Sequence, residues 1–324
     1  MPEKILITGA NGFIGSHLCE LLHEKGLQIR ALNEYNSFNF WGHLEKIPCQ
    51  DALEIISGDL RDPFFCQRLC EGVGAIFHLG ALIAIPHSYL APKSYADTNI
   101  LGTLNLLEAA KTQGVKKFIH TSTSEVYGSA LYTPIDEKHP LQPQSPYSAS
   151  KIAADMMALS YFHSFDLPVC IARPFNAYGP RQSARAFIPS IISQILSGAK
   201  ELKVGSLSPK RDLNFVRDTC WGFWAIFQSG KNGEVYNIGS GAEYSMREVL
   251  ERVCEILKCE VKITEDAARI RPEKSEVQRL LCDSSKLKAI SAWESRVSLE
   301  EGLDETIAYI RANLDSYKSG IYNV

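Results

Sequence analysis

Residues 4–15 read Lys-Ile-Leu-Ile-Thr-Gly-Ala-Asn-Gly-Phe-Ile-Gly, an apolar run that passes directly into a glycine-rich turn. Such a run is typical of a strand buried on both faces of a parallel sheet. Residues 13–25 then place apolar side chains at helical spacing. Gly9, Gly12 and Gly15 therefore lie between a strand and a helix N-terminus, where backbone amides can bind the pyrophosphate of a dinucleotide. The alternative is an ordinary turn with chance glycines, but the position directly after a first strand favours the dinucleotide site.

Outward from this motif, apolar runs alternate with helical patterns, which predicts an α/β fold with a doubly wound parallel (Rossmann) sheet. The expected strands are 5–8, 28–32, 53–57, 75–79, 117–121 and 169–173, and the expected helices here are 13–25, 98–113 and 147–165. Beyond residue 176 we expect helices over 186–196, 218–228, 246–257 and 299–313, strands near 202–204 and at 235–238, and a loop around 206–211. We expect a dinucleotide-binding domain over residues 1–176, to which about 212–240 return. A smaller α/β substrate lobe should occupy most of 177–324.

The composition restricts the class of protein. The 324 residues are 45% hydrophobic and 22% charged, as in ordinary globular proteins, and the net charge of −3 argues against nucleic acid as a partner. Nine cysteines are scattered without a Cys-x-x-Cys motif, which argues against a zinc site or a disulfide framework and favours reduced thiols. No apolar run is long enough for a membrane span, and the first strand leaves no room for a secretory signal. We therefore expect a cytoplasmic protein with no metal, nucleic-acid or membrane partner.

The cofactor preference depends on the residue that follows the second strand. Asn33 stands there, where a ribose-binding carboxylate is common, and Arg30 is nearby. An amide can hydrogen-bond a ribose hydroxyl but does not repel a 2′-phosphate as a carboxylate does. The sequence therefore predicts NAD and leaves NADP open. Asp59, after the third strand, is a candidate for contact with the adenine, and a turn or N-cap aspartate is the alternative.

Tyr147 and Lys151 lie four residues apart and share one face of an expected helix. A free phenol has a pKa of about 10, and a nearby ammonium favours the phenolate, so Tyr147 can take a proton from a hydroxyl. Thr123 follows another strand and can bond the same hydroxyl. Glu125, two residues further on, would supply a second base. The alternatives are a core tyrosine beside a solvated lysine and a solvent-facing loop carboxylate.

Arg211 and Arg271 lie in expected loops of the smaller lobe. A guanidinium pairs with phosphate oxygens through two parallel hydrogen bonds, so both arginines are candidates for binding a diphosphate. Asn176 is a candidate for a substrate phosphate or sugar. Surface arginines in ion pairs and a turn asparagine are the alternatives.

Together these residues resemble the extended short-chain dehydrogenase/reductase family, in its nucleotide-sugar 4,6-dehydratase branch, over essentially the whole chain. The likeness is greatest to the NAD-dependent N-acetylhexosamine 4,6-dehydratases of legionaminic-acid pathways. The stretches that carry it are Tyr35-Asn36-Ser37-Phe38-Asn39, Ala81-Leu82-Ile83-Ala84-Ile85-Pro86-His87-Ser88-Tyr89, Thr121-Ser122-Thr123-Ser124-Glu125-Val126-Tyr127-Gly128, Gly179-Pro180-Arg181-Gln182-Ser183-Ala184-Arg185 and Arg271-Pro272-Glu273-Lys274-Ser275-Glu276.

The resemblance implies a lyase that converts UDP- or GDP-linked N-acetylglucosamine into its 4-keto-6-deoxy derivative. Thr123, Tyr147 and Lys151 would form the oxidation centre at C4. Glu125 would remove the C5 proton so that the C6 hydroxyl leaves as water, and hydride would return to C6. The nucleobase, the C2 substituent and the configuration at C5 stay open.

The resemblance also implies the binding residues. Arg211 and Arg271 would hold the nucleotide diphosphate, with Asn176 at the substrate. Such proteins commonly form homodimers through two helices, here those that begin near Asn99 and Tyr147. The expected cofactor contacts are Gly9, Gly12, Phe13, Ile14, Gly15, Asn33, Asp59, Leu60, Leu79, Ala81, Tyr147 and Lys151.

One departure from the family pattern concerns the acid. Well-known hexose 4,6-dehydratases carry Asp-Glu after the threonine, and this chain carries Ser124-Glu125. Glu125 could carry its proton to the leaving oxygen, water could do so, or Ser124 could relay it. Ser-Glu also occurs in nucleotide-uronate decarboxylases, for which Arg181 or Arg185 would bind the C6 carboxylate. A 4-epimerase is a further alternative that needs no second base, and an NAD(P)-sensing scaffold is one without chemistry.

Overall fold

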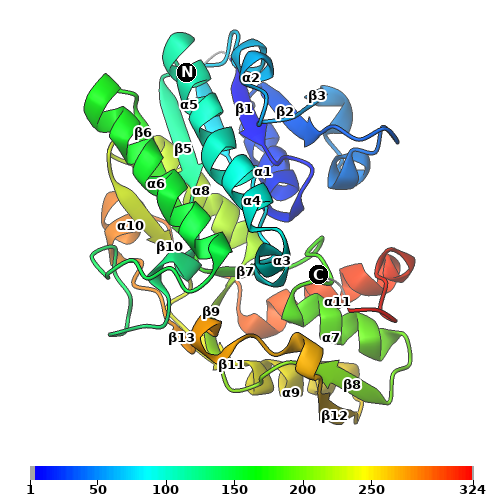
Figure 1. The fold of residues 1–324 in the computed structure, drawn as a ribbon. Helices are drawn as coiled ribbons and strands as arrows, with labels where there is room; N and C mark the ends of the chain where they lie inside the picture. Colours follow the sequence, from blue (N-terminus) through cyan, green and yellow to red (C-terminus); the bar gives the residue numbers. More distant parts are fainter. Residues whose placement is uncertain (1–3, 323–324) are drawn as a thin grey trace.

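The computed structural model describes residues 4–322 and confirms the doubly wound parallel sheet (Figure 1). Seven strands lie in the order β10-β6-β5-β4-β1-β2-β3. They are β1 (Ile5–Thr8), β2 (Ile29–Glu34), β3 (Glu54–Gly58), β4 (Ala75–His78), β5 (Lys117–Thr121), β6 (Val169–Pro174) and β10 (Val235–Ile238). The chain starts in the middle and winds outward in both directions, so the strand order reverses between β1 and β4. In such sheets ligands bind at the carboxyl ends of the strands near this point.

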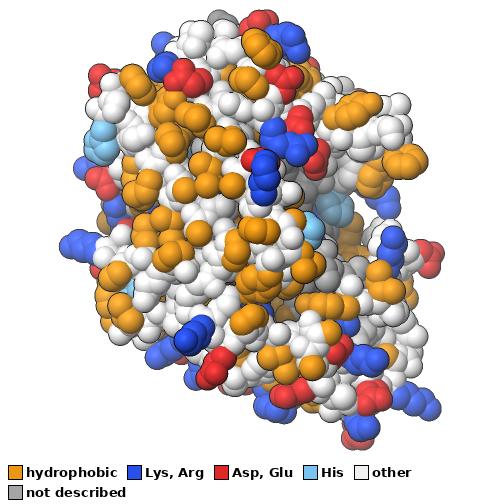
Figure 2. Space-filling view, in the orientation of Figure 1, with side chains coloured by type: hydrophobic (Ala, Val, Ile, Leu, Met, Phe, Trp, Pro, Cys, Tyr) orange, Lys and Arg blue, Asp and Glu red, His pale blue; other side chains and the backbone are white. Residues whose placement is uncertain are grey.

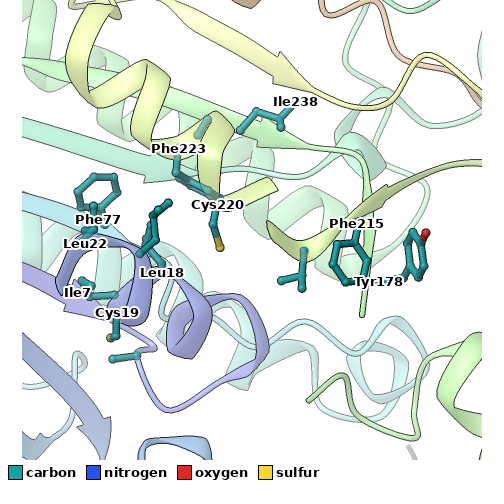
Figure 3. Packing of buried hydrophobic residues seen from close by; sticks show 14 of the residues in the cluster. Ile7, Leu18, Cys19, Leu22, Phe77, Tyr178, Phe215, Cys220, Phe223 and Ile238 are labelled. Carbon is teal, nitrogen blue, oxygen red and sulfur yellow. The ribbon is translucent and has the colours of Figure 1, made fainter. Parts of the chain in front are cut away.

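Helices cover both faces of the sheet. On one face lie α1 (Phe13–Glu24) and α8 (Val216–Ser229), and on the other lie α2 (Pro63–Leu69), α5 (Gly102–Thr112) and α6 (Pro146–Phe165). Because successive strand residues point to opposite faces, Ile5 and Ile7 join the core beneath α1 and α8, while Leu6 joins the other. Figure 3 shows Ile7 and Phe77 packed against residues of both helices of the first core, among them Leu18 and Phe223.

The start of α6 is fixed by local chemistry. Ser145 caps the helix and accepts a hydrogen bond from the amide of Ser148 at 3.1 Å, while the Ser148 hydroxyl accepts from the amide of Ser145 at 3.0 Å. Pro146, at the first helical position, has no amide that needs an acceptor. The helix ends at Asp166, whose φ of 55° is left-handed. Tyr147 is therefore held in the first turn of α6, directly against the sheet's carboxyl edge.

The smaller lobe is built around one strand that the sequence analysis missed. A loop was expected around 206–211, but β9 (Lys210–Phe215) already begins there, and Arg211 lies on this strand and not in a loop. β7 (Asn176–Tyr178), β11 (Glu243–Ser245) and β13 (Arg279–Leu280) all pair with β9. A second pair joins β8 (Glu201–Val204) to β12 (Lys262–Glu265). The lobe's helices are α7 (Phe187–Leu196), α9 (Met246–Leu257) and α11 (Leu299–Ala312).

Four helices were not expected: α2, α3 (Ile85–Leu90), α4 (Pro92–Tyr95) and α10 (Ser285–Ile290). The helix expected over 98–113 is present as α5, but it is preceded by a π-helical segment, η3 (Ala96–Leu101). Among residues 4–322, no helix combines the length and the apolar character needed to cross a membrane.

Candidate active site

The glycine turn leaves space that any side chain would fill. Gly9 has a φ of +65°, and a Cβ on it would lie 2.9 Å from the amide nitrogen of Gly80. A Cβ on Gly15 would lie 2.1 Å from the carbonyl oxygen of Gly9. Gly12 caps α1 without a side chain, so the first-turn amides have no side-chain acceptor among residues 4–322. This turn fits a dinucleotide pyrophosphate, which needs close approach to free amides at a helix N-terminus.

The end of β2 offers a buried acceptor. Asn33 is buried, and its amide nitrogen donates to the Glu34 carbonyl at 3.0 Å and to the Ser57 hydroxyl at 3.2 Å. Its Oδ1 is buried without a hydrogen-bond partner, which fits a ribose hydroxyl as the missing donor. Asp59 is less available for contact with the adenine, because its carboxylate already accepts hydrogen bonds from the side chain and the amide of Arg61.

Arg30 is turned away from this edge. Its guanidinium donates to the carbonyls of Leu69 and Glu71 at 2.7 and 2.9 Å and pairs with Glu54 at 3.0 Å. A guanidinium with three partners at the opposite end of β2 is not placed to attract a 2′-phosphate.

The remaining cofactor candidates follow the carboxyl ends of β3 and β4. Leu60 is buried after β3, and Leu79 and Ala81 are half-buried after β4. The amide of Leu79 donates to the Thr8 carbonyl at 3.2 Å. The Thr8 hydroxyl accepts from the amide of Gly80 at 2.9 Å, which holds the turn after β4 against the glycine turn. Both turns therefore lie at one edge of the sheet.

Tyr147 and Lys151 are both buried on α6. The Lys151 ammonium donates to the carbonyl of Thr121 at 2.6 Å, and burial lowers its pKa to about 8 although Asp155 raises it. Tyr147 is hydrogen-bonded to Thr123. Burial raises the pKa of Tyr147, and the hydrogen bond from Thr123 opposes that rise. The protein alone therefore holds Tyr147 as a phenol, whereas the sequence analysis considered only cationic groups that lower its pKa, the Lys151 ammonium and the oxidised nicotinamide.

Glu125 lies in the short helix η4 (Ser124–Tyr127), which Thr123 caps. Burial and then the charge of Glu125 raise the pKa of Tyr147. Burial lowers the pKa of Arg211, and the charge of Glu125 opposes that fall. The carboxylate makes no hydrogen bond with any of residues 4–322. Ser124 is buried beside it, and its hydroxyl likewise bonds no described residue. The site therefore holds a carboxylate that is free to act as a base next to Tyr147.

A buried polar network beneath the site was missed by the sequence analysis. Asp155, one turn after Lys151 on α6, accepts from the Ser122 hydroxyl at 2.6 Å and from Arg173 at 2.8 Å. Arg173 also donates to the Tyr127 hydroxyl at 2.7 Å. These bonds hold η4 and α6 at a fixed spacing, and with them Thr123, Glu125 and Tyr147. The i, i+4 spacing of Lys151 and Asp155 was the available signal.

The two candidate arginines meet at a shared carboxylate. Arg211 is buried on β9 and donates to Glu276 at 3.2 Å, and Arg271 lies 3.5 Å from the same oxygen. The Nη1 of Arg271 is buried and makes no hydrogen bond. The Oδ1 of Asn176 is also buried without a partner. The charge of Glu125 acts on Arg211, which links the arginine cluster electrostatically to the catalytic candidates.

Hydrogen bonds that the sequence did not reveal attach residues 271–276 to the large domain. The hydroxyls of Tyr89 and Ser275 are hydrogen-bonded at 2.6 Å, and Ser275 donates to the Gln144 carbonyl at 2.5 Å. Tyr89 lies on α3, which packs against α6. Figure 2 shows the surface hollowed between the large domain and the smaller lobe on the right of the view.

Of the two arginines considered for a uronate carboxylate, Arg181 is engaged elsewhere. It donates to both oxygens of Glu20 at 2.7 and 2.8 Å. Arg185 is exposed, and its side chain donates to the Ser183 hydroxyl at 3.3 Å.

With this geometry, the chain matches the GDP-mannose 4,6 dehydratase family model over residues 6–306. The chain belongs to that family, and it is an enzyme of the nucleotide-sugar 4,6-dehydratase class. A dTDP-glucose 4,6-dehydratase from Streptomyces antibioticus is 32% identical over 314 residues, which cover 96% of this chain and 93% of that protein.

Solved structures agree with this class. The dTDP-glucose 4,6-dehydratase DesIV from Streptomyces venezuelae, determined with NAD bound, superposes with a TM-score of 0.89 at 30% identity, over 97% of this chain and 99% of that one. A UDP-glucuronic acid 4-epimerase from Bacillus cereus, in complex with UDP-glucuronic acid and NAD, reaches a TM-score of 0.86 at 29% identity, over 96% and 99%. The fold is thus shared with 4-epimerases of nucleotide sugars.

Proposed function

We propose that this enzyme converts UDP- or GDP-linked N-acetylglucosamine into the 4-keto-6-deoxy sugar nucleotide, with NAD as its cofactor. The dehydratase class follows from the family. The amino sugar is supported by the stretches 35–39 and 271–276, which resemble N-acetylhexosamine dehydratases of legionaminic-acid pathways.

The observation that carries the proposal is the free Glu125 carboxylate beside Tyr147. Once C4 is a ketone, the C5 proton becomes acidic, and a carboxylate close to the oxidation centre can remove it. The C6 hydroxyl then leaves as water. Ser124 has no pKa suited to protonating that hydroxyl, but its free, buried side chain is placed to relay a proton from Glu125 or from water.

Tyr147 acts at O4 as the base for the first step. Its raised pKa in the protein alone means that the phenolate must be stabilised in the complex. The Lys151 ammonium, held by the Thr121 carbonyl, supplies one positive charge, and Thr123 supplies a hydrogen bond. Bound NAD would supply the hydride acceptor for this oxidation and a positively charged ring that further favours the phenolate of Tyr147.

The residues present fit NAD better than NADP. The glycine turn, the first turn of α1 and the unpaired Asn33 oxygen hold the pyrophosphate and the adenosine ribose. Arg30, the cation nearest in sequence, is committed to Glu54 and two carbonyls. Asn33 itself does not exclude a 2′-phosphate, so NADP binds more weakly but is not rejected.

The alternatives are disfavoured by particular contacts. A uronate decarboxylase needs a cation for the C6 carboxylate, and Arg181 is already neutralised by Glu20, which leaves only the exposed Arg185. A 4-epimerase returns hydride to C4 and has no use for a second base. The free Glu125 beside the oxidation centre therefore favours elimination.

The enzyme is proposed to be a cytoplasmic homodimer that assembles through α5 and α6 with the π-helical segment before α5. Leu101 and Met156 on these helices are 49% and 45% exposed, although both are apolar. Figure 2 shows hydrophobic side chains gathered over the face where Figure 1 places α5 and α6. Such a patch on a monomer favours a partner surface.

Turnover in deuterated water, followed by NMR, tests the proposal. UDP- and GDP-N-acetylglucosamine are compared with dTDP-glucose and UDP-glucuronic acid. The proposal expects a 4-keto-6-deoxy product from one of the amino sugars, with solvent deuterium at C5 and no carbon dioxide. Preferred turnover of dTDP-glucose would overturn the substrate, and carbon dioxide or a simple C4 epimer would overturn the reaction.

A further inference from the structure

Glu276 lies between the two arginines proposed to bind the diphosphate. Its Oε1 accepts from Arg211 at 3.2 Å and lies 3.5 Å from Nη1 of Arg271. The side chain of Arg211 is 8% exposed and that of Glu276 is 15% exposed, so water screens this contact only weakly. A carboxylate therefore already occupies the anion site of the protein.

The arginines have unused hydrogen-bonding capacity toward a larger anion. Nη1 of Arg271 is buried and makes no hydrogen bond, and Nη1 of Arg211 reaches only the carbonyl of its neighbour Lys210 at 3.1 Å. One carboxylate oxygen shared between two guanidinium groups cannot form the paired, two-armed contacts that phosphate oxygens can. The cluster is thus occupied but not saturated.

The charges of the cluster are balanced without a ligand. Arg211 and Arg271 are positive, and Glu276 and Glu125 are negative and interact with Arg211. A diphosphate cannot enter beside Glu276 without bringing like charges together in a half-buried site, where the repulsion is stronger than in water. Either the carboxylate leaves or the diphosphate binds weakly.

We propose that Glu276 is an internal anion that holds the arginine site in the free enzyme and that the substrate diphosphate displaces. The proposal deepens the proposed function and rests on the arginines being the diphosphate site. Glu276 neutralises and orients the two guanidinium groups between turnovers, and it competes with the diphosphate for them. It lowers affinity for any nucleoside diphosphate and so favours release of the product.

The backbone on both sides of the Glu276 side chain is anchored, so the side chain can rotate while residues 275–276 stay in place. Ser275 is anchored to Tyr89 and Gln144, and the Glu276 carbonyl accepts from the Ser129 hydroxyl at 3.5 Å. Among residues 4–322, the carboxylate forms hydrogen bonds or ion pairs only with the two arginines. Displacement is therefore a rotation of one side chain about a fixed backbone.

Calorimetric titration of the full-length enzyme tests this role. The probes are UDP, GDP and inorganic pyrophosphate, with uridine and guanosine as ligands that lack phosphate. We expect Glu276→Gln to bind the diphosphates and pyrophosphate about tenfold more tightly than the natural enzyme, with nucleoside affinity unchanged. Glu276→Ser, which leaves no amide in the site, should give the same direction.

Glu243→Gln is the matched control. Glu243 pairs with Arg279 at 2.7 Å in the same small sheet, and its loss changes the net charge by the same amount. It should leave all affinities unchanged. Equal tightening in this control would mean a general charge effect and would overturn the proposal.

Arg271→Gln distinguishes the diphosphate site from the displaced-anion role of Glu276. If it weakens diphosphate binding while both Glu276 variants bind no more tightly than the natural enzyme, the displaced-anion role is wrong and the diphosphate site stands. If Arg271→Gln and Arg211→Gln leave diphosphate affinity unchanged, the diphosphate site itself is wrong, and the proposal fails with it.

Discussion

Arg181 holds both carboxylate oxygens of Glu20, at 2.7 and 2.8 Å, and so joins the loop that enters the smaller lobe to helix α1. His17, one turn earlier on the same helix, is hydrogen-bonded to the Pro180 carbonyl at 3.1 Å. Because α1 begins at the glycine turn, this contact couples the proposed cofactor site to the start of the substrate lobe.

The ion pair between Glu20 and Arg181 should make the free energy of unfolding depend on pH. Burial alone would raise the pKa of Glu20, but hydrogen bonds from His17 and Arg181 lower it from its ordinary 4.5 to about 2. A depressed carboxyl pKa stabilises the fold above pH 4.5, and that contribution is lost as pH falls through about 2. We expect Glu20→Gln to lower the free energy of unfolding by about 1 kcal/mol at pH 7, because solvent partly screens this ion pair, and by much less near pH 2, measured by urea unfolding. Glu24→Gln, an exposed change on the same helix, is the control, and an equal cost at both pH values would contradict this.

Tyr147→Phe removes the proposed base at O4 and keeps the ring. We expect kcat to fall by about 10²- to 10⁴-fold, as loss of a positioned base does. Cofactor binding, measured by fluorescence titration, should change little, because the ring still packs against Tyr95 and Ile85. Tyr132→Phe on the exposed surface is the control, and near-normal turnover of the Tyr147 variant would refute the role.

Glu125→Gln should separate oxidation from elimination. The amide cannot take the C5 proton, but Tyr147 and Lys151 are intact, so C4 oxidation continues. We expect reduced cofactor to accumulate on mixing with substrate, while the 4-keto-6-deoxy product falls by at least about 10²-fold. Absorbance of the reduced nicotinamide and NMR of the product measure the two steps. Unchanged product formation would remove Glu125 from the mechanism.

The protonation state of Lys151 should set the pH above which kcat/KM falls. Burial lowers the pKa of Lys151 to about 8, so the ammonium is present below that pH and lost above it in the free enzyme. We therefore expect kcat/KM to fall above about pH 8. Asp155 raises the pKa of Lys151, so Asp155→Asn should move this limb to lower pH. A profile that stays in place in a variant whose thermal unfolding shows it folded would contradict the coupling.

Asn33→Asp should sharpen the choice of dinucleotide. A carboxylate at the end of β2 still accepts from a ribose hydroxyl but repels a 2′-phosphate. We expect NADPH affinity to drop by about tenfold or more relative to NADH, measured by fluorescence titration. An unchanged ratio would place the adenosine ribose away from Asn33.

The elements that could be predicted from sequence are those whose signals are local. The glycines of the first turn, the apolar strands of the large sheet and the Ser145–Pro146 start of α6 each carry their own chemistry within a few residues. Tyr147 and Lys151 were correctly placed on one helix for the same reason. Their burial beside Glu125 and Arg211 depends on the whole fold.

The missed elements depend on contacts between distant residues. β9 reads Lys-Arg-Asp-Leu-Asn-Phe, which is too polar for a predicted strand. It is buried because Asp212 accepts from the amides of Gly241 and Cys282 at 2.9 and 3.0 Å. Arg173 and Asp155 likewise form a buried ion pair, which cannot be predicted from the residues next to either of them. Polar residues can be buried when partners far along the chain satisfy them, and a single sequence does not show those partners.

The segments that connect the large sheet to the small sheet are very short. Only Phe175 separates β6 of the large sheet from β7 of the small one, and the turn from β10 to β11 is tied to Asp212 by Ser240 and Gly241. Two such short crossings tie the large sheet to the small one, so lengthening either of them should change the position of Tyr147 on α6 relative to Arg211 on β9.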